Sequence, residues 1–292
     1  MRRYRFVHAE RATYPVTVLC RVLRVSRAGY YAWAGRGASA RARADAELHL
    51  QLKEAHERSR GTYGVPRVHA ARRAAGSRTS RRRVARPMQA AGLVGCCRRR
   101  RVRTTGADPA HAPAPNLVAR DFTAAAVDRL WLGDITYVPT QAGWRSLAIL
   151  LDAHSRRSVG WAMADHLRTA LALGALMMAL ARRRPGAGLV HHPDRGCHYT
   201  AAAYRQALAA RGVVASMSRR GDCLDNAMAE RFFATLKAEL VDAQRWPPRA
   251  AAQTAIFAWI EAFYNRQRRH SALNYQPPVT FVEVVLLSCP AA

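Results

Sequence analysis

The chain has 292 residues, enough for two domains or for one large domain with an appendage. Half of the residues are apolar, which allows a buried core and excludes wholesale disorder. The formal charge of +28 comes from 47 Lys and Arg against 19 Asp and Glu, and it predicts a nucleic acid as the partner. A merely basic soluble enzyme is the alternative, but the arginines come in runs, as at residues 81–83, 98–101 and 182–184.

The cysteines and the apolar segments indicate in which cellular compartment we expect the protein. Six cysteines form no C-x-x-C pair, and the chain has no secretory leader, so we expect reduced thiols in a cytoplasm. The longest strongly apolar stretch, residues 169–181, is too short to cross a bilayer and ends in arginines. It predicts a buried helix, and we expect no membrane association.

Residues 1–45 are basic and predicted to be helical. One helix follows Pro15, a break falls near Val25, and Ser26 is a suitable N-cap for a second helix. This pair is typical either of half a helix-turn-helix or of a small packing motif, and the pattern does not separate the two.

Residues 46–105 predict three further helices. The second opens near Pro66, which suits a first helical turn. The third opens after Ser80 and carries an apolar stripe of Val84, Met88 and Ala91. Its other side carries four arginines: Arg81, Arg82, Arg83 and Arg86.

A short helix with an arginine face after a turn is typical of an element that contacts DNA. A solvated charged face is the alternative. We count the four arginines together with Arg67 as candidate DNA contacts, and we assign residues 46–105 to a helix-turn-helix-like DNA-binding region. Pro87 conflicts with this helix, because proline in a helix interior removes a hydrogen bond and costs roughly 3 kcal/mol or a kink.

The remaining residues predict a different architecture. Residues 98–116 are basic and then rich in Pro, Ala and Gly, which favours a linker, placed at residues 106–124. Three strands with short turns then predict an antiparallel meander, at residues 130–139, 144–152 and 158–164. Helices are expected at residues 169–183, 201–210, 226–241 and 249–266, and strands at 189–192 and 213–217. This order predicts a mixed α/β fold over residues 125–284.

Three acidic residues stand out in this basic chain. Asp134 lies in the middle of a predicted strand, Asp194 at the end of another, and Glu230 on a predicted helix. Thirty-five residues stand between Asp194 and Glu230. Lys237, two turns after Glu230, points to the same border of the apolar stripe of its helix. The pattern therefore predicts three carboxylates that converge on one point beside a lysine.

Carboxylates that converge repel one another, and divalent cations relieve that repulsion. Oxygen ligands without histidine favour Mg²⁺, with Mn²⁺ as a substitute. Two such ions would suit phosphodiester chemistry by in-line displacement, with Lys237 on a DNA phosphate.

Other readings of these residues stay open at this point. Any single Asp or Glu is more often structural or solvated, and Asp152, Asp222 and Asp225 lie in the same region. The cluster of His191, His192, Cys197 and His198 could indicate zinc, but its spacing fits no standard zinc pattern.

Motifs along nearly the whole chain resemble those of the insertion sequence three family of transposases, of the OrfB type, within the DDE transposase and retroviral integrase superfamily. The motifs that carry the resemblance are residues 14–33, 61–68, 80–84, 131–137, 192–196, 218–227, 230–237 and 264–273. Their joint pattern is specific, although no single motif is.

The resemblance implies an RNase H-like catalytic core, a mixed five-stranded sheet with flanking helices, preceded by an all-helical region. It implies that Asp134, Asp194 and Glu230 are the catalytic and metal-binding triad. The implied activity is Mg²⁺-dependent 3′-end nicking and strand transfer at the terminal inverted repeats of a mobile element. The implied partners are element and target DNA, an upstream-frame transposase subunit or fusion, and further copies of the chain, at a bacterial nucleoid.

The chain departs from the family pattern at three places. Pro193 stands where the family usually has Ser, Leu224 where it has Trp, and Pro87 where a helix-compatible residue is normal. None of these removes an acidic residue of the expected triad. Two other functions remain as alternatives: a DNA-binding regulator with an inactive core, and an RNase H-like nuclease that does not join strands.

Overall fold

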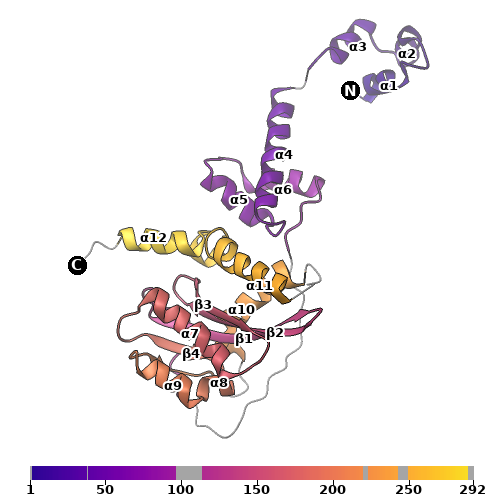
Figure 1. Cartoon of the computed structure of the whole chain (residues 1–292). Coiled ribbons are helices and arrows are strands. Elements are labelled where there is room, and N and C mark those ends of the chain that lie inside the picture. Colours follow the sequence, from indigo (N-terminus) through magenta and orange to yellow (C-terminus); the bar gives the residue numbers. More distant parts are fainter. Residues whose placement is uncertain (1, 38, 97–113, 220–222, 243–248, 289–292) are drawn as a thin grey trace. The chain divides into compact units, whose positions relative to one another are not determined.

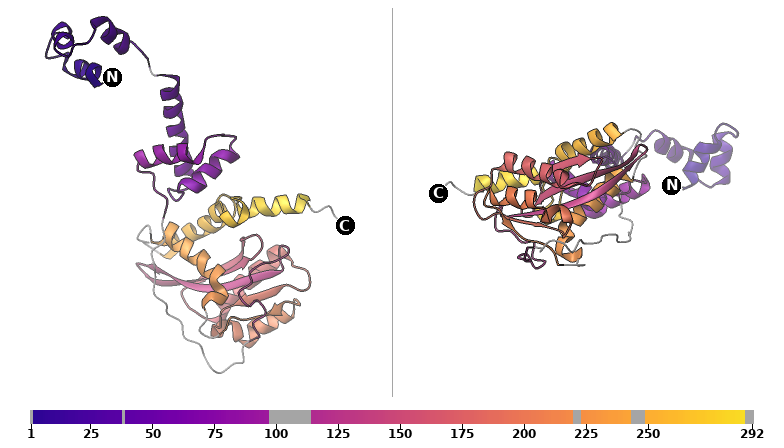
Figure 2. Two further views of the ribbon diagram at one scale, coloured as in Figure 1. Left: turned by 180° about the vertical axis from the view of Figure 1, so that it is seen from behind. Right: turned by 60° about the horizontal axis from the view of Figure 1, so that its bottom comes forward.

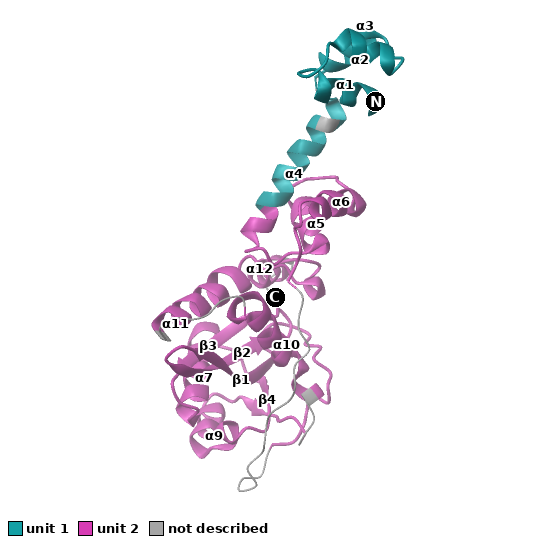
Figure 3. Cartoon of the chain, turned by 90° about the vertical axis from the view of Figure 1, so that its right-hand side faces the viewer, with its two compact units in different colours: residues 1–54 teal, residues 55–292 magenta. Residues whose placement is uncertain are grey.

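The computed structural model describes residues 2–37, 39–96, 114–219, 223–242 and 249–288 (Figure 1). The chain divides into two compact units, residues 1–54 and residues 55–292 (Figure 3). Among the described helices, none combines the length and the apolar character that a membrane span needs.

The first unit consists of short helices around a small core. These are α1 (Arg2–Glu10), α2 (Val16–Val22) and α3 (Arg27–Ala34), followed by the start of α4 (Ala40–Arg58). The core consists of four buried side chains: Val7, Leu19, Cys20 and Tyr30. The Ser26 hydroxyl accepts a 3.3 Å hydrogen bond from the Gly29 amide, so the predicted N-cap is confirmed.

The second unit opens with the end of α4 and with helices α5 (Val65–Ala74) and α6 (Arg81–Ala90). Ser80 caps α6, because its hydroxyl accepts a 3.4 Å hydrogen bond from the Arg83 amide. Val84 and Met88 are buried as predicted. Ala91, predicted as the third apolar contact, lies beyond the last helical residue and is exposed, so that part of the stripe was wrong.

A five-stranded mixed sheet forms the centre of the second unit. Its strands are β1 (Leu130–Thr140), β2 (Gly143–Asp152), β3 (Ser158–Ala164), β4 (Val190–Pro193) and β5 (Val214–Ala215), and their order is β3-β2-β1-β4-β5. β1, β2 and β3 pair antiparallel, which confirms the predicted meander. β4 pairs parallel to β1 and to β5, as expected for strands joined through helices.

Helices cover both faces of the sheet. On one face, α7 (Thr169–Arg183) and α9 (Ala202–Ala209) pack on Trp131, Leu150 and Val159 in the main hydrophobic core. The apolar stretch predicted to be a buried helix is therefore confirmed as α7. The opposite face is covered by α10 (Ala227–Leu236), which Figure 2 shows in front of the strands when the molecule is seen from behind.

The other elements are short or lie near the C-terminus. They are α8 (Cys197–Thr200), the 3-10 turns η1 (Cys223–Asn226) and η4 (Ser271–Leu273), the π-helical turns η2 (Lys237–Val241) and η3 (Trp259–Tyr264), α11 (Arg249–Ala258) and α12 (Pro278–Ser288). The predicted helix at residues 249–266 is thus α11 continued by a π-helical turn. Helix α12 was not predicted.

The predicted linker divides into two parts. Residues 106–113 lie outside the described residues. Residues 114–124 run along the core, where the Leu117 amide donates a 2.9 Å hydrogen bond to the Ser216 hydroxyl and Val118 is buried. The second part of this segment therefore packs as part of the second unit. The predicted domain boundaries otherwise stay predictions.

Candidate active site

The register of the sheet brings Asp134 and Asp194 together. Asp134 lies on β1, one residue after Gly133, which pairs with Pro193 at the end of β4. Asp194 directly follows Pro193, so the two aspartates occupy neighbouring positions on parallel chains. The carboxyl ends of parallel strands are where α/β sheets commonly place their sites.

Gly133 permits this close strand pairing. A Cβ atom at Gly133 would lie 2.8 Å from Cε1 of the His191 ring, closer than real Cβ contacts. The His191 ring is fully buried and forms a 2.9 Å hydrogen bond with the Tyr204 hydroxyl. Burial lowers the pKa of His191 to about 3, so this ring is neutral at physiological pH.

Helix α10 carries Glu230 to the same place. The Asn226 side-chain amide, at the start of the helix, donates a 2.9 Å hydrogen bond to the Gly133 carbonyl. Ala229, Phe233 and Leu236 are buried as predicted, whereas Glu230 one turn after Asn226 is exposed. No role was predicted for Asn226, although its position at the N-cap of the helix was the available signal.

Asp134 is influenced electrostatically by the other predicted residues of the site. Withdrawal of Asp134 from water raises its pKa well above the usual value, and the charges of Asp194 and Glu230 raise it further. The amide of Ile135 and the charge of Lys237 act in the opposite direction. The other two predicted acids and the predicted lysine therefore all act on Asp134. Burial also raises the pKa of Asp194, against a 3.0 Å hydrogen bond from the Gly196 amide.

The fit to a metal can be judged from these donors. The three carboxylates supply the hard oxygen ligands that Mg²⁺ and Mn²⁺ prefer, and their mutual repulsion is what a bound cation would relieve. Within the described part of the chain, no three Asp, Glu, His or Cys side chains are arranged closely enough to hold a metal ion. The acids thus share one electrostatic environment without being drawn together into a closed ligand set.

The competing carboxylates have structural partners. Asp152 is buried and accepts hydrogen bonds from the amide and hydroxyl of Ser155, at 2.7 and 2.6 Å. Asp225 is buried and paired with the Arg219 guanidinium at 2.9 Å. Asp222 lies outside the described residues.

The predicted alternative of a zinc cluster is not supported by the described residues. The His192 ring bonds to the Ser216 hydroxyl at 2.7 Å and to the Asp225 carbonyl at 3.0 Å, so both of its nitrogens are used. His191 is held by Tyr204. The Cys197 sulfur lies 3.8 Å from Nε2 of the neighbouring His198 ring. Cys20 and Cys197 are free thiols.

The predicted DNA contacts fall into two groups. The four arginines of α6 are all exposed: Arg81, Arg82, Arg83 and Arg86. Arg67 differs, because its side chain is 28% exposed and its Nε donates a 3.2 Å hydrogen bond to the Arg269 carbonyl. Lys237 is half-buried at the end of α10. The arginines of α6 face solvent, whereas Arg67 is part of a contact with the core.

Comparison with known proteins agrees with this architecture. The family described as integrase core domain matches residues 124–223, a second family with the same description matches residues 211–278, and an HTH-like domain matches residues 42–101. Transposase InsF for insertion sequence IS3A of Escherichia coli strain K12 is 35% identical over 281 residues, which cover 96% of this chain and 98% of the relative. The chain belongs to the IS3 family of transposases.

Other relatives of this transposase extend the comparison. The insertion element IS600 uncharacterized 31 kDa protein of Shigella sonnei is 41% identical over 266 residues, or 91% of this chain and 97% of the relative. Among solved structures, a simian T-cell lymphotropic virus intasome is 15% identical with a TM-score of 0.47, over 67% of this chain and 66% of that one. The HTLV-2 integrase catalytic core in complex with magnesium is 14% identical with a TM-score of 0.42, over 55% and 99%.

Proposed function

We propose that this transposase nicks the 3′ ends of its element and joins them to target DNA, with Asp134, Asp194 and Glu230 as the catalytic triad. The observation that carries the proposal is the sheet register, which pairs Gly133 with Pro193 and so places Asp134 and Asp194 at neighbouring positions, with the start of α10 held on Gly133 by Asn226. Burial raises the pKa of Asp134, and the charges of Asp194 and Glu230 raise it further, which favours a bound cation at this place. The family to which the chain belongs supports the same assignment.

Two Mg²⁺ ions held by these carboxylates, or Mn²⁺ in their place, would supply Lewis acidity for the in-line displacement. The side chains of the protein have simpler tasks. Asp134 and Asp194 place two carboxyl groups at neighbouring positions on paired strands, and Glu230 adds a third from the helix. Lys237 holds a DNA phosphate beside them, which is consistent with its influence on Asp134.

The proposed reaction has two chemical steps. In the first, a water oxygen attacks the phosphorus at the element end, the bond to the 3′ oxygen breaks, and a free 3′-hydroxyl forms. In the second, that 3′-hydroxyl attacks a target phosphodiester and displaces the target's own 3′ oxygen. One phosphodiester is broken for each one made in the second step, so no covalent intermediate with the enzyme is needed.

The proposed partners follow from this reaction. The substrates are the terminal inverted repeats and a target duplex, met in the cytoplasm at the nucleoid. Two element ends must be held at once, which favours several copies of the chain on DNA, together with the product of an upstream reading frame as a subunit or a fusion. The exposed arginines of α6 and the HTH-like match at residues 42–101 support a role of this region in end binding.

The test is the Asp194→Asn variant assayed on an element-end duplex with Mg²⁺. Nicking should fall by more than about 100-fold, since even the partners of metal ligands contribute about 10–100-fold. Binding of the duplex, measured by fluorescence anisotropy, should stay close to the wild-type value. Asp165→Asn removes an exposed carboxylate after β3 and serves as the matched control.

The products of the same assay separate the related activities. Joined strand-transfer products exclude a nuclease that only cuts, and cutting by the wild type excludes an inactive DNA-binding regulator. Loss of binding in Asp194→Asn equal to the loss of nicking would contradict the assignment of this residue to catalysis.

A further inference from the structure

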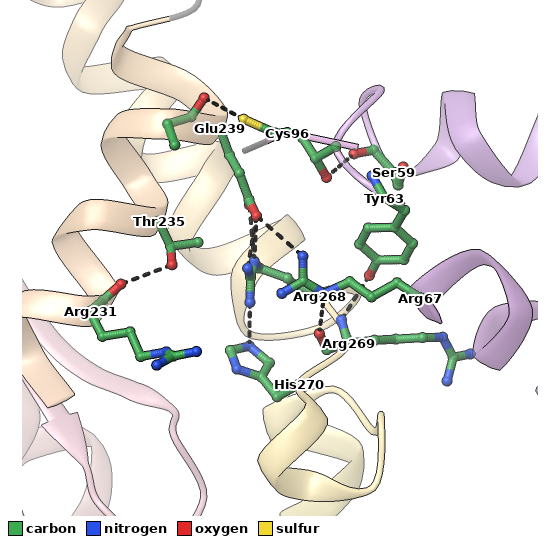
Figure 4. A network of polar contacts seen from close by, with 12 residues as sticks. Ser59, Tyr63, Arg67, Cys96, Arg231, Thr235, Glu239, Arg268, Arg269 and His270 are labelled. Carbon is green, nitrogen blue, oxygen red and sulfur yellow. Dashed lines mark hydrogen bonds and ion pairs between the residues drawn. The ribbon is translucent and has the colours of Figure 1, made fainter. Parts of the chain in front are cut away.

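A basic site, separate from the acidic one, lies where helix α5 meets the core of the second unit. The Tyr63 hydroxyl, just before α5, donates a 3.2 Å hydrogen bond to the Gln267 carbonyl and accepts a 2.7 Å bond from the Arg269 amide (Figure 4). These contacts join parts of the chain about two hundred positions apart. They fix the helical region against the segment that follows η3, within the second unit.

A buried ion pair lies beside these contacts. The Arg268 guanidinium donates to both carboxylate oxygens of Glu239, at 2.8 to 3.1 Å, and the two side chains are only 4% and 5% exposed. Arg67 reaches the same carboxylate at 3.9 Å (Figure 4). Glu239 therefore lies near two arginines, and its hydrogen bonds are to Arg268.

An open cavity of about 460 Å³ adjoins this ion pair. Its basic lining consists of five side chains: Arg67, Arg156, Arg231, Arg268 and His270. The volume falls in the range of about 300–1,000 Å³ that small-ligand sites occupy. The described residues that line the cavity include no Asp and no Glu.

The cavity is distinct from the proposed triad. Met228, Phe232 and Thr235 of α10 line it. At about 100° per residue, Glu230 projects from nearly the opposite side of this helix. Helix α10 therefore separates two sites of opposite character, one acidic around Glu230 and one basic around Arg231.

Glu239 balances part of the cavity's positive charge through Arg268 and Arg67, and the charges of Arg156 and Arg231 remain without an ion pair in the described part of the chain. Neither Arg156 nor Arg231 has a carboxylate within ion-pairing distance there, and Figure 4 shows the Arg231 guanidinium extended toward His270. Burial lowers the pKa of His270 well below its usual value, and the charges of Arg268, Arg67 and Arg156 lower it further. The cations are therefore close enough to act on one another, as a site for an anion requires.

We propose that this cavity binds one phosphate group of the DNA backbone through Arg156 and Arg231, with Arg67 completing the contact from α5. The ligand is a phosphodiester monoanion, whose two non-bridging oxygens planar guanidinium groups bind in bidentate fashion. A backbone phosphate fits better than a free one, because the chain carries a formal charge of +28 and α6 presents its exposed arginines in the same unit. The DNA part of this inference rests on the proposed function.

The occupant would also stabilise the contact between the helical region and the core. Arg67 comes from α5, Arg156 from the turn between β2 and β3, and Arg231 from α10. A phosphate bound by all three would link these elements and would relieve the repulsion among them. Binding of an element end would thereby hold the HTH-like region on the core.

The test combines protein and DNA changes in the full-length chain. The Arg156→Gln, Arg231→Gln double variant removes both guanidinium charges and keeps the three carbon atoms nearest the backbone and a polar end on each side chain. Duplexes that carry a single uncharged methylphosphonate are scanned along the element end by fluorescence anisotropy. At one position the methylphosphonate should weaken wild-type binding about tenfold and leave the binding of the double variant unchanged.

The salt dependence gives a second readout. The slope of log affinity against log salt should fall by about 1 in the double variant, as for the loss of one phosphate contact. The Arg205→Gln, Arg211→Gln double variant removes the same charge from exposed positions of and after α9, and it should leave the slope and the phosphate scan unchanged. Lysine in place of glutamine at position 231 (Arg231→Lys) restores the positive charge and should recover part of the affinity for DNA. A loss of affinity caused by misfolding would not be recovered by this change.

Free phosphate is tested separately with the wild type and the same variants. Millimolar inorganic phosphate could raise the melting temperature of the wild type and not that of the Arg156→Gln, Arg231→Gln variant. If these two proteins then also have the same salt slope and the same methylphosphonate scan, the site binds a free anion and the DNA part of the proposal is overturned. If both double variants behave alike in every measurement, the whole proposal is overturned. In either case, the proposed function remains supported if the wild type nicks DNA and Asp194→Asn does not. If the double variant has an altered salt slope but the wild type shows no nicking, only the proposed function is contradicted.

Discussion

Asp225 shows how one buried carboxylate can organise several segments. Its oxygens accept hydrogen bonds from the Arg219 amide and guanidinium at 2.8 and 2.9 Å and from the Asn116 side chain at 2.8 Å. Arg120 is a further ionic neighbour, at 3.4 Å. The next residue, Asn226, holds the start of α10 on β1. Asp225 therefore connects the chain before β1 to the turn that carries Glu230 into position.

The Asp225→Asn variant should unfold more easily at neutral pH, by about 1–3 kcal/mol. The loss is at the lower end of the range for buried pairs, because the Arg219 side chain is 53% exposed and can be hydrated instead. Denaturant unfolding followed by circular dichroism measures the difference. Asp165→Asn, an exposed carboxylate, is the control and should change the free energy of unfolding little.

The pH dependence of the same variant checks the cause. Hydrogen bonds and charge from Arg219 lower the pKa of Asp225 in the folded protein. A carboxyl group with a lowered folded pKa stabilises the fold above its unfolded pKa of about 3.9, and this contribution is lost as the pH falls below that value. The wild type should therefore lose stability more steeply than Asp225→Asn on acidification below about pH 4. Parallel curves for the two proteins would contradict this account.

Helix α6 contains an apparent conflict between sequence and structure. Pro87 lies inside the helix, where proline has no amide hydrogen to donate and its ring crowds the preceding turn. The helix nevertheless continues to Ala90, because Ser80 caps its start and Val84 and Met88 are buried. Tertiary packing thus compensates for an unfavourable residue.

Pro87→Ala should stabilise the second unit by about 1–3 kcal/mol, since proline is about 3 kcal/mol less favourable than alanine in a helix interior. The melting temperature and the affinity for the duplex should both increase. The affinity should increase because a more stable α6 loses less conformational entropy when its arginines bind DNA. Gln89→Ala, at an exposed position of the same helix, is the control with little expected effect. A lower melting temperature for Pro87→Ala would mean that the proline ring itself contributes packing.

Strongly patterned elements could be predicted from the sequence. Strand β3 and helix α7 have the predicted bounds, because their apolar residues follow one period and clear turn residues flank them. The sheet register places Asp134 and Asp194 at neighbouring positions, and the charges of Asp194 and Glu230 both act on Asp134. The roles of these residues in catalysis remain proposals.

Other features depend on contacts that no local pattern encodes. Lys237–Val241 and Trp259–Tyr264 form π-helical turns, whose backbone hydrogen bonds differ from those of an α-helix. The apolar pattern of these residues does not distinguish the two kinds of helix. Arg67 was grouped with the exposed arginines of α6, although its position is set by Glu239 and Arg269 far along the chain. The tie between Asn226 and Gly133 spans more than ninety residues, so only the fold could reveal it.

At the scale of the whole molecule, the net charge should dominate the affinity for DNA. With +28 on the chain, affinity should fall at least about 100-fold between 50 and 200 mM salt, because counterions released from the duplex drive binding. Titrations of one element-end duplex over this range measure the slope. The melting temperature of the protein at the same salt concentrations is the control for effects on the fold, and an affinity independent of salt would contradict the assignment of DNA as the partner.

The hydrogen bond between Asn226 and the Gly133 carbonyl has a consequence for synthesis of the protein on the ribosome. The strand that bears the first aspartate is made early, but the helix that bears Glu230 can be anchored on it only after residue 226 has left the exit tunnel. On the proposed function, a nascent or prematurely terminated chain that stops before this point has no complete set of acids. Such a fragment could occupy DNA through its basic helices but could not break it, so interrupted translation would leave the host chromosome uncut.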